Sequence, residues 1–558
     1  MQIIKWFFIL TLFFLSEHVV SQSTNLYLDA KDYHVLDRME ILSQGFNGQL
    51  FSSLKPYSRS NAAHLAVWSD ISSGNRLRSK ADQYNRSSLL MNMREGSPAT
   101  DRFEFAHKPM LKHFYQTKAN FYEVNQPDFF LVINPVLQVR MGKQTDYDKN
   151  LFLNARGVTV RGRIAKKLGF SSTIIENQER TPQFVQKQIH GMRAVPGVGF
   201  YKFYKRDSSA VDYFDGRGYL VYNANKYIDL QFGFDKHFIG NGFRSLLLSD
   251  WGNSYLFAKI NTRIWKFHYQ NLFMELNSPF VKRGDSLLKR KYAAMHFLSY
   301  QANRWLNIGL FEGVIFGRPD RFDFQYLNPV IFYRHIEGTI GSPDNALAGL
   351  DVKANVAKRF QLYGQLMLDE FIISKIRKNP GYWANKYGIQ LGAKYINAFG
   401  VKNLDLQAEV NRVRPFTYSH NDTINNYTHY NQPLAHPLGA NLEEWLGMVR
   451  YQPHPQWRVY GRMQVYRKGL DSLGVNTGGD IFKSYLTRNR EDGFTLAGGN
   501  RLTVAHATLQ VSYEWKQNLF LEAMIQHRTY KEQLGKSGEN TWFSAGLRWN
   551  SAQRIFDF

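Results

Sequence analysis

The feature that most constrains the fold is an alternation of apolar and polar residues, which recurs from about residue 129 onward. In YIDLQFGFDK (227–236), every second residue from Ile228 to Phe234 is apolar. The same pattern is found in NLDLQAEVN (403–411), WRVYGRMQVY (457–466) and WFSAGLRWN (542–550). Successive side chains of a β-strand point to opposite faces. Each segment is therefore predicted to form a strand with one apolar face and one polar face.

About 18 such segments predict an all-β chain that forms a transmembrane antiparallel outer-membrane β-barrel. Their length is close to the 9–11 residues, and their number is even, as is typical of bacterial barrels. Aromatic residues make up 15% of the chain although the mean hydropathy is −0.41, which fits a lipid-facing wall around a polar lumen. The predicted strands begin near residues 129, 151, 168, 217, 227, 254, 264, 290, 304, 347, 359, 385, 403, 443, 456, 505, 517 and 541.

The connections between these strands alternate in length, provided that 178–216 and 317–346 are each one long excursion. In outer-membrane barrels the short turns are periplasmic and the long loops extracellular. We therefore expect localisation in the outer membrane with that orientation. The short turns are predicted at 165–169, 223–226, 260–263, 301–304, 356–359, 397–403, 452–456 and 515–518.

The first residues have the pattern of a secretory signal peptide, predicted to span 1–21. Lys5 precedes an apolar run from Trp6 to Leu15, and Ser21 provides a small residue for cleavage. The apolar run is shorter than the roughly 20 residues of a membrane-spanning helix. The chain contains no cysteine, so we expect an exported protein whose stability does not depend on disulfides.

Residues 22–128 lack the two-residue period. Instead, DYHVLDRMEILSQG (32–45), NAAHLAVWSDI (61–71) and SKADQYNRSSLLMNMRE (79–95) are typical of helices. We predict a small helical element on the periplasmic side that partly plugs the lumen, followed by the barrel over 129–558.

The formal net charge of +24 indicates anionic partners. Export argues against nucleic acid, which leaves lipopolysaccharide phosphates, acidic polysaccharides and outer-membrane lipids as the expected partners. The alternative is that the charges only line a solvated lumen and the hairpin tips.

Several motifs resemble the Wzi-like capsule assembly family, in its Bacteroidetes branch that includes the gliding-motility outer-membrane protein RemB. They are LDRMEI (36–41), SSLKPYSR (52–59), IENQERTPQF (175–184), VPGVGFYK (195–202), FIGNGFRSLLLSD (238–250), YLNPVIFYRHIEGTIGSPDNALAGLD (326–351) and HYNQPLAHPLGAN (429–441). The resemblance covers nearly the whole mature chain. It implies an 18-stranded barrel with an N-terminal helical element that helps attach capsular polysaccharide to the cell surface. RemB-like relatives imply a role in gliding, with gliding or secretion machinery as further partners. The resemblance supplies no catalytic residue and no cofactor.

Candidate glycan-binding residues cluster in the predicted external segment 316–338. Arginines can bind carboxylates or phosphates in bidentate fashion, and aromatic faces can stack on sugar rings. The alternative is a constriction loop folded into the lumen, with its arginines paired to Asp320, Asp323 and Glu337. The candidates are Arg318, Arg321, Tyr326, Tyr333 and Arg334.

Two other external segments supply the remaining candidates. Segment 418–441 contains His420, His429 and His436, whose spacing fits no established metal-binding pattern, so no metal site is predicted. Segment 236–253 contains Gly240-Asn241-Gly242 followed by Arg244 and Trp251. It lacks the strand–loop–helix context of a phosphate-binding loop. Arg244 is expected to face either an anionic glycan or a luminal carboxylate.

Three functions remain open at this point. We expect a non-enzymatic surface protein that assembles, anchors or binds capsular polysaccharide or exopolysaccharide, supporting gliding or adhesion. A porin-like channel, passive or substrate-selective, is the alternative, since barrels of 16–18 strands can enclose an aqueous pore. An outer-membrane hydrolase is the third and less favoured function, because barrel enzymes assemble their sites across strands. Gly284-Asp285-Ser286-Leu287 also matches a serine-esterase signature. None of the 16 histidines has the aspartate three residues before it that this esterase family requires.

Overall fold

The computed structural model describes most of the chain. The described residues are 23–28, 31–72, 79–96, 110–111, 113–280, 287–318, 321–330, 332–341, 344–370, 373–471, 474–554 and 556–558. The predicted signal peptide at 1–21 and the Gly284-Asp285-Ser286 part of the esterase-like motif lie outside them. Within the described residues, no helix has both the length and the apolar character of a membrane-spanning helix.

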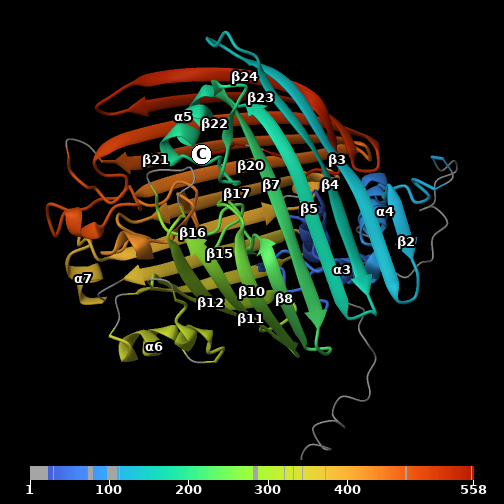
Figure 1. The fold of residues 1–558 in the computed structure, drawn as a ribbon, viewed down its shortest axis with the longest axis horizontal. Coiled ribbons are helices and arrows are strands. Elements are labelled where there is room, and N and C mark those ends of the chain that lie inside the picture. The colour runs from blue at the N-terminus through green and yellow to red at the C-terminus, as the bar shows by residue number, and fades with distance from the viewer. Residues whose placement is uncertain are drawn as a thin grey trace, which may run out of the picture.

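Eighteen antiparallel strands of the described chain form a closed barrel, which confirms the predicted fold class (Figure 1). The barrel closes where Trp542 to Trp549 of the last strand pair with Gln144 to Leu137 of the first. The first nine strands are β3 (Phe129–Gln144), β4 (Leu151–Ile164), β5 (Leu168–Arg180), β7 (Asp207–Asn223), β8 (Ile228–Asp235), β10 (Tyr255–Ile264), β11 (Phe267–Asn277), β12 (Arg290–Gln301) and β13 (Leu306–Phe316). The others are β14 (Asn345–Val356), β15 (Phe360–Glu370), β16 (Lys386–Tyr395), β17 (Leu404–Val413), β20 (Leu442–His454), β21 (Trp457–Leu470), β22 (Asn500–Lys516), β23 (Leu519–Glu532) and β24 (Ser537–Trp549).

Two short strands extend the barrel sheet. β2 (Tyr122–Asn125) pairs with β3, and β6 (Lys202–Tyr204) pairs with β7. Pairing with the barrel therefore begins a few residues before 129.

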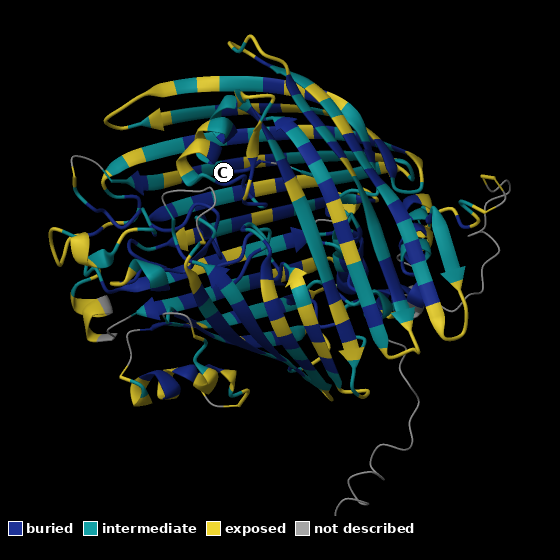
Figure 2. Cartoon of the chain, viewed as in Figure 1, coloured by how far each residue is buried: buried dark blue, intermediate teal, exposed yellow. Residues whose placement is uncertain are grey.

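Along the strands of the barrel wall, buried residues alternate with more exposed ones (Figure 2). In β8, Leu230 and Phe232 are exposed, whereas Asp229 and Gln231 are buried. The same alternation occurs in β17, where Asp405, Gln407, Glu409 and Asn411 are buried. A wall that buries its polar residues and exposes its apolar residues is suited to lipid outside and a polar lumen inside.

Three helices precede the barrel, where the sequence predicts them. They are α2 (Asp32–Ser43), α3 (Arg59–Ser72) and α4 (Lys80–Asn92). They share a small apolar core that includes Leu36, Met39, Ala62, Leu65 and Leu89. We call residues 23–96 the N-terminal element.

The N-terminal element is bonded to the short turns at one end of the barrel. Asn85 Nδ2 donates to Gln452 Oε1 at 2.6 Å, and Asn518 Nδ2 donates to Asn92 Oδ1 at 2.8 Å. The backbone N–H of Phe46 donates to the carbonyl of Arg304 at 3.2 Å. Because three different turns contact it, the N-terminal element occupies the short-turn end of the lumen.

Two sequence-based boundaries are wrong. The predicted turn at 260–263 is part of β10, and the turn itself lies at Trp265–Lys266 between β10 and β11. The INTR stretch resembles a turn because Asn261 and Arg263 are polar, but both follow the alternation of β10. The strand predicted to begin near 217 begins at Asp207.

The two assumed excursions are each a single connection. The first joins β5 to β7 and contains α5 (Gln183–Met192). The second joins β13 to β14 and contains η3 (Phe324–Leu327) and α6 (Tyr333–Thr339).

The connection 236–253 folds into the lumen. Its short strand β9 (Phe238–Ile239) pairs with β1 (Leu54–Lys55) of the N-terminal element. Leu246, Leu247 and Leu248 are fully buried in the largest apolar core. We call residues 236–253 the inward loop. It connects the loop end of the barrel to the N-terminal element and fills much of the lumen.

The second excursion does not fold into the lumen. Tyr326, Tyr333 and Ile336 pack on Ala294 and Val314 of the wall. The neighbouring residues of those strands, such as Met295 and Ile315, belong to the luminal core, so Ala294 and Val314 point outward. Figure 1 shows α6 outside the barrel wall. The alternative of a luminal constriction loop is therefore wrong for this segment.

Candidate functional site: a cationic cavity in the lumen

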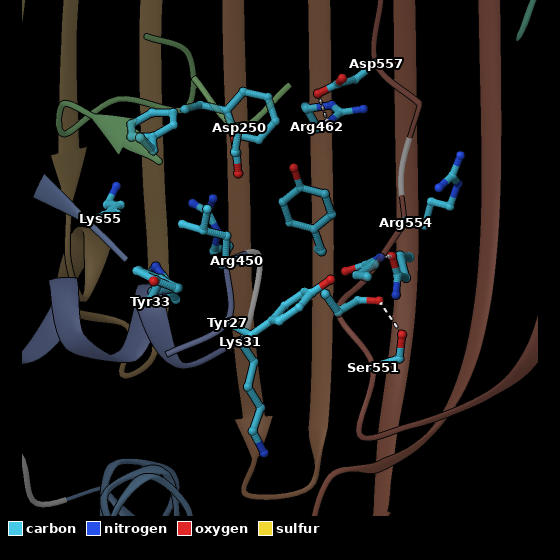
Figure 3. A pocket seen from close by; sticks show the side chains of 18 of the residues that line it. Tyr27, Lys31, Tyr33, Lys55, Asp250, Arg450, Arg462, Ser551, Arg554 and Asp557 are labelled. Carbon is cyan, nitrogen blue, oxygen red and sulfur yellow. Dashed lines mark hydrogen bonds and ion pairs between the residues drawn. The ribbon is translucent and has the colours of Figure 1, made fainter. Parts of the chain in front are cut away.

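A cavity of about 530 Å³ remains in the lumen (Figure 3). It is enclosed by the N-terminal element, the inward loop, the barrel wall and the final residues of the chain. Its lining extends from Tyr27 and Lys31 of the N-terminal element to Pro196, Trp251 and Pro437 in the long connections. Its volume is within the range of about 300–1,000 Å³ that is usual for small-ligand sites.

Cations and aromatic rings dominate the lining. Twelve lysines and arginines face it, against five aspartates. The cations are Lys31, Arg38, Lys55, Arg217, Lys236, Arg244, Lys394, Arg450, Arg458, Arg462, Arg548 and Arg554. The aromatic residues are Tyr27, Tyr33, Phe238, Phe243, Trp251, Tyr451, Tyr460, Phe520 and Phe556.

Most of the cations are neutralised by carboxylates. Arg458 Nη1 lies 2.7 Å from Glu514 Oε2, and Arg548 Nη2 lies 2.6 Å from Glu522 Oε1. Lys31 Nζ also contacts Glu514, at 2.5 Å. The Lys31–Glu514 pair joins the N-terminal element to the barrel wall, whereas the other two pairs connect adjacent strands of the wall. They leave little free charge for a ligand.

Three cations retain binding capacity. Among the described residues, Lys55 and Arg450 have no carboxylate within ion-pair distance. Arg450 makes one short polar contact, from Nη1 to Gln407 Oε1 at 3.0 Å. Arg462 binds Asp557 through Nη1, but its Nε and Nη2 are buried without a hydrogen-bond partner in the described chain. An unpaired buried donor is costly, so these atoms would gain from an anionic ligand.

Burial affects Lys55 directly. Its Nζ lies 4.6 Å from the ring centre of Phe238, and the side chain is enclosed between the N-terminal element and the inward loop. Burial is the main cause that lowers the pKa of Lys55 below its ordinary value, although Asp37 acts in the opposite direction. An anion bound beside Lys55 would stabilise its protonated form.

Trp251 gives the cavity an aromatic face at the side of the long connections. Its ring is 4.8 Å from that of Phe558, and its Nε1 is buried without an acceptor in the described chain. A tryptophan that offers both a ring face and a donor can stack on a sugar and bond to its oxygen. Trp251 is one of the residues predicted from the sequence.

Arg244, also predicted, holds the inward loop in place. Its Nη2 lies 3.1 Å from Glu444 Oε1 on β20, and its Nη1 lies 3.1 Å from Asp557 Oδ2 in the final residues. Burial alone would lower the pKa of Arg244, but Asp557 and Glu444 together raise it above its ordinary value. Arg244 therefore stays charged and faces luminal carboxylates, which is the second of its two expected roles.

The five predicted residues of segment 316–338 lie apart from the cavity. Arg318 forms a bidentate pair with Asp344, at 2.7 and 2.6 Å, and Tyr326 donates to the same carboxylate at 2.7 Å. Tyr333 is buried beneath the segment, whereas Arg321 and Arg334 are exposed.

The three predicted histidines are buried in the connection between β17 and β20. His436 Nε2 lies 2.8 Å from Glu444 Oε2, and His429 Nε2 lies 3.1 Å from the carbonyl of Ser254. His420 Nδ1 accepts from the backbone N–H of Asp422 at 3.3 Å. The contacts of His436 and His429 fold the connection onto β20 and onto the residue before β10, whereas the contact of His420 is internal to the connection. Within the described part of the chain, no group of three or more histidine or acidic residues is arranged to hold a metal ion.

Sequence reasoning did not select Lys55, Arg450 or Arg462. The positions of the two arginines in their strands could have indicated that both face the lumen. Arg462 belongs to the polar face of WRVYGRMQVY, and Arg450 lies opposite Tyr460, which is on that same face. Basic residues on the inner faces of adjacent strands would have indicated a cationic patch. The sequence pattern does not show which of these basic residues lack a carboxylate partner. That depends on how the long loops fold, and the apolar–polar alternation does not predict their fold.

Comparison with solved structures supports the fold. The chain aligns with Wzi of Escherichia coli, an outer-membrane protein involved in group 1 capsule assembly and described as a carbohydrate-binding β-barrel, with a TM-score of 0.56 and 14% identity. The alignment covers 95% of this chain and 100% of Wzi. OprD of Pseudomonas aeruginosa aligns at a TM-score of 0.42 and 10% identity, over 75% of this chain and 94% of OprD. No protein-family model matches the sequence, and no curated protein matches it. The chain has a Wzi-like fold, an 18-stranded outer-membrane-type barrel.

Proposed function

We propose that this protein is a non-enzymatic outer-membrane barrel that anchors capsular polysaccharide or exopolysaccharide at the cell surface by binding an acidic saccharide in the luminal cavity. The observation that carries the proposal is a luminal cavity whose lining includes aromatic faces and, within the described chain, cations without a carboxylate partner. In this proposal the long connections are extracellular and the short turns periplasmic.

The chemistry of the cavity favours an acidic sugar. Arginine binds carboxylate in a planar fork, and Arg450 and Arg462 lie on the inner faces of two adjacent strands. Trp251 offers a stacking surface at the side of the cavity that faces the long connections. A uronate residue at the end of a polysaccharide has both the carboxylate and the ring that these groups bind. The carbohydrate-binding description of Wzi supports the same class of ligand.

The filled lumen argues against the channel alternative. The inward loop crosses it to the N-terminal element, and the N-terminal element contacts the short turns. Ions would have to pass both. The hydrolase alternative gains no support, because none of the cavity contacts described above places a nucleophile beside a base and an orienting group.

Binding of acidic and neutral oligosaccharides to the purified protein tests the proposal. Oligogalacturonate should bind and neutral dextran oligosaccharides should not, as measured by calorimetry. The double variant Lys55→Ala/Arg450→Ala should weaken binding at least about tenfold, because hydrogen bonds to charged groups are lost. Arg156→Gln is the matched control, since Arg156 is exposed on the outer wall.

Equal binding of both oligosaccharides, or no effect of the double variant, would refute the acidic-saccharide site. In cells, gene deletion should release polysaccharide from the surface. If the protein belongs with the RemB-like proteins of the Bacteroidetes, as its motifs suggest, deletion should also reduce spreading over surfaces. Gliding or secretion machinery would then be the partners to test by cross-linking.

A further inference from the structure

The segment on the outside of the barrel has a role that the saccharide site does not explain. We call residues 321–330 and 332–341 the outer-wall flap. It contains η3 and α6, and its inner side packs on outward-facing residues of β11, β12 and β13. The flap therefore lies where other parts of the barrel wall present their apolar side chains outward.

The wall beneath the flap carries polar groups on its outer face. The ring of His296 stacks on Tyr333 of the flap, with centres 4.0 Å apart. Glu312 accepts from the backbone N–H of Arg334 at 3.2 Å, and Asn271 donates to the carbonyl of Pro329 at 3.2 Å. Lipid chains cannot form such bonds. The flap replaces lipid over this part of the wall.

The outer side of the flap is strongly apolar. Val330 is 81% exposed, Phe324 77% and Phe332 76%, and Leu327 is also exposed. Four large apolar side chains within nine residues would be unfavourable in water. Below the flap, the exposed Leu310 of β13 belongs to the apolar outer wall. The flap thus continues the lipid-facing surface of the barrel.

Exposed cations border this apolar surface. The side chain of Arg334 is 78% exposed although it pairs with Glu337 at 2.6 Å, and Arg321 is exposed as well. The exposed apolar residues lie in η3 and in the residues before α6, and the two arginines lie at either end of them. Exposed apolar residues bordered by basic residues are typical of elements that lie in a membrane interface. Basic residues there attract anionic headgroups.

We propose that the outer-wall flap is a membrane-interface element that inserts Phe324, Val330 and Phe332 among lipid acyl chains and binds the phosphates of anionic lipids through Arg321 and Arg334. Two observations carry this inference: continuity with the lipid-facing wall, and the complementarity of exposed cations to phosphate. The proposal does not depend on the saccharide site.

The absence of cysteine from the sequence allows a direct test. Val330→Cys is labelled with an environment-sensitive fluorophore and reconstituted in phosphatidylcholine–phosphatidylglycerol vesicles. Brominated lipid chains should quench the label, and aqueous iodide should quench it poorly. The matched control is Leu486→Cys, because Leu486 is 63% exposed in the connection between β21 and β22. Its label should respond to iodide and not to brominated lipid.

The charge component is tested by titrating phosphatidic acid into the labelled protein in uncharged detergent. Arg321→Ser/Arg334→Ser should weaken binding by about fivefold for each arginine, whereas Arg490→Ser, an exposed loop arginine, should not. If iodide quenches the label at position 330 fully, the proposal is wrong, and the exposed apolar surface would instead bind a protein partner. If brominated lipid quenches the label but the arginine substitutions do not weaken binding of phosphatidic acid, the proposed binding of lipid phosphates by Arg321 and Arg334 is wrong. Heat-modifiability on gels confirms that each variant is folded.

Discussion

Replacement of Arg244 by methionine tests whether the inward loop is held by luminal ion pairs. Arg244 is buried, and its guanidinium contacts Glu444 and Asp557 together with the carbonyl of Asp557, which accepts from Nη2 at 2.6 Å. Methionine keeps much of the side-chain length and removes every one of these bonds. The backbone pairing between barrel strands is not altered, so the effect should be confined to the loop and the final residues.

The expected free-energy cost depends on the contacts that the Glu444 and Asp557 carboxylates retain in the variant. Removing one partner of a buried ion pair typically costs about 3–5 kcal/mol. Glu444 still accepts from Gln464 at 2.7 Å and from His436 at 2.8 Å, and Asp557 keeps Arg462 at 3.0 Å. The cost should therefore lie near the lower limit, at about 3 kcal/mol, which corresponds to about a hundredfold increase in opening of the loop.

Hydrogen exchange at the inward loop measures this opening. The N–H of Gly240 donates to Ser53 O at 2.7 Å, and the N–H of Ile239 donates to Leu248 O at 2.9 Å, so both amides report docking. Arg244→Met should accelerate their exchange about a hundredfold. The matched control is Arg412→Met, which breaks an exposed pair with Glu443 and should change little.

An acceleration below about tenfold, or about 1.4 kcal/mol, would refute the reasoning. If Arg244 instead contacted a glycan, its loss would weaken saccharide binding and leave the exchange rates unchanged. Measuring both hydrogen exchange and saccharide binding in Arg244→Met therefore distinguishes a loop-anchoring role of Arg244 from a glycan-binding role.

Two further predictions concern the lumen. Binding of oligogalacturonate should weaken as pH rises through the lowered pKa of Lys55, because only protonated Lys55 attracts the carboxylate, and this loss should begin below the ordinary lysine value of about 10.4. The loss should be absent in Lys55→Ala, and calorimetry over a range of pH would show a flat profile if the cation plays no part. In planar bilayers the wild-type protein should show no steady conductance, whereas replacing residues 236–253 by a short glycine–serine linker and also deleting residues 23–96 should produce it. A stable open channel in the wild type would support the porin-like alternative.

The sequence predicts the barrel well because the physical cause of the pattern is local. Each wall residue faces either lipid or lumen, so the alternation can be read strand by strand. It fails at the start of β7, where the inward-facing Val211 and Tyr213 are apolar and the outward-facing Asp212 is polar. At this end of β7 the inner face packs on the folded connections and not on a water-filled lumen. Its inward residues are therefore apolar, which is the reverse of the pattern in the other strands.

The long connections could not be placed in the same way. The course of each depends on contacts with segments hundreds of residues away, such as Arg244 with Asp557. One signal was present for the outer-wall flap. His296 and Glu312 occupy outward positions in β12 and β13, where lipid contact would require apolar residues. Polar residues on the lipid-facing side of a predicted barrel strand indicate that another part of the chain covers them.

The Gly240-Asn241-Gly242 turn shows how the lumen is closed and why the cavity remains cationic. Gly240 has φ +135, and a Cβ at either glycine would collide with luminal side chains. This close approach lets the backbone N–H groups of Phe243 and Arg244 donate to the Glu409 carboxylate at 2.7 and 3.0 Å. The turn thus binds an anion, as a phosphate loop does, but the anion is a side chain of the wall. Because Glu409 and other wall carboxylates are bound to the inward loop, they are not available to Lys55 and Arg450, which are left to attract an external acid.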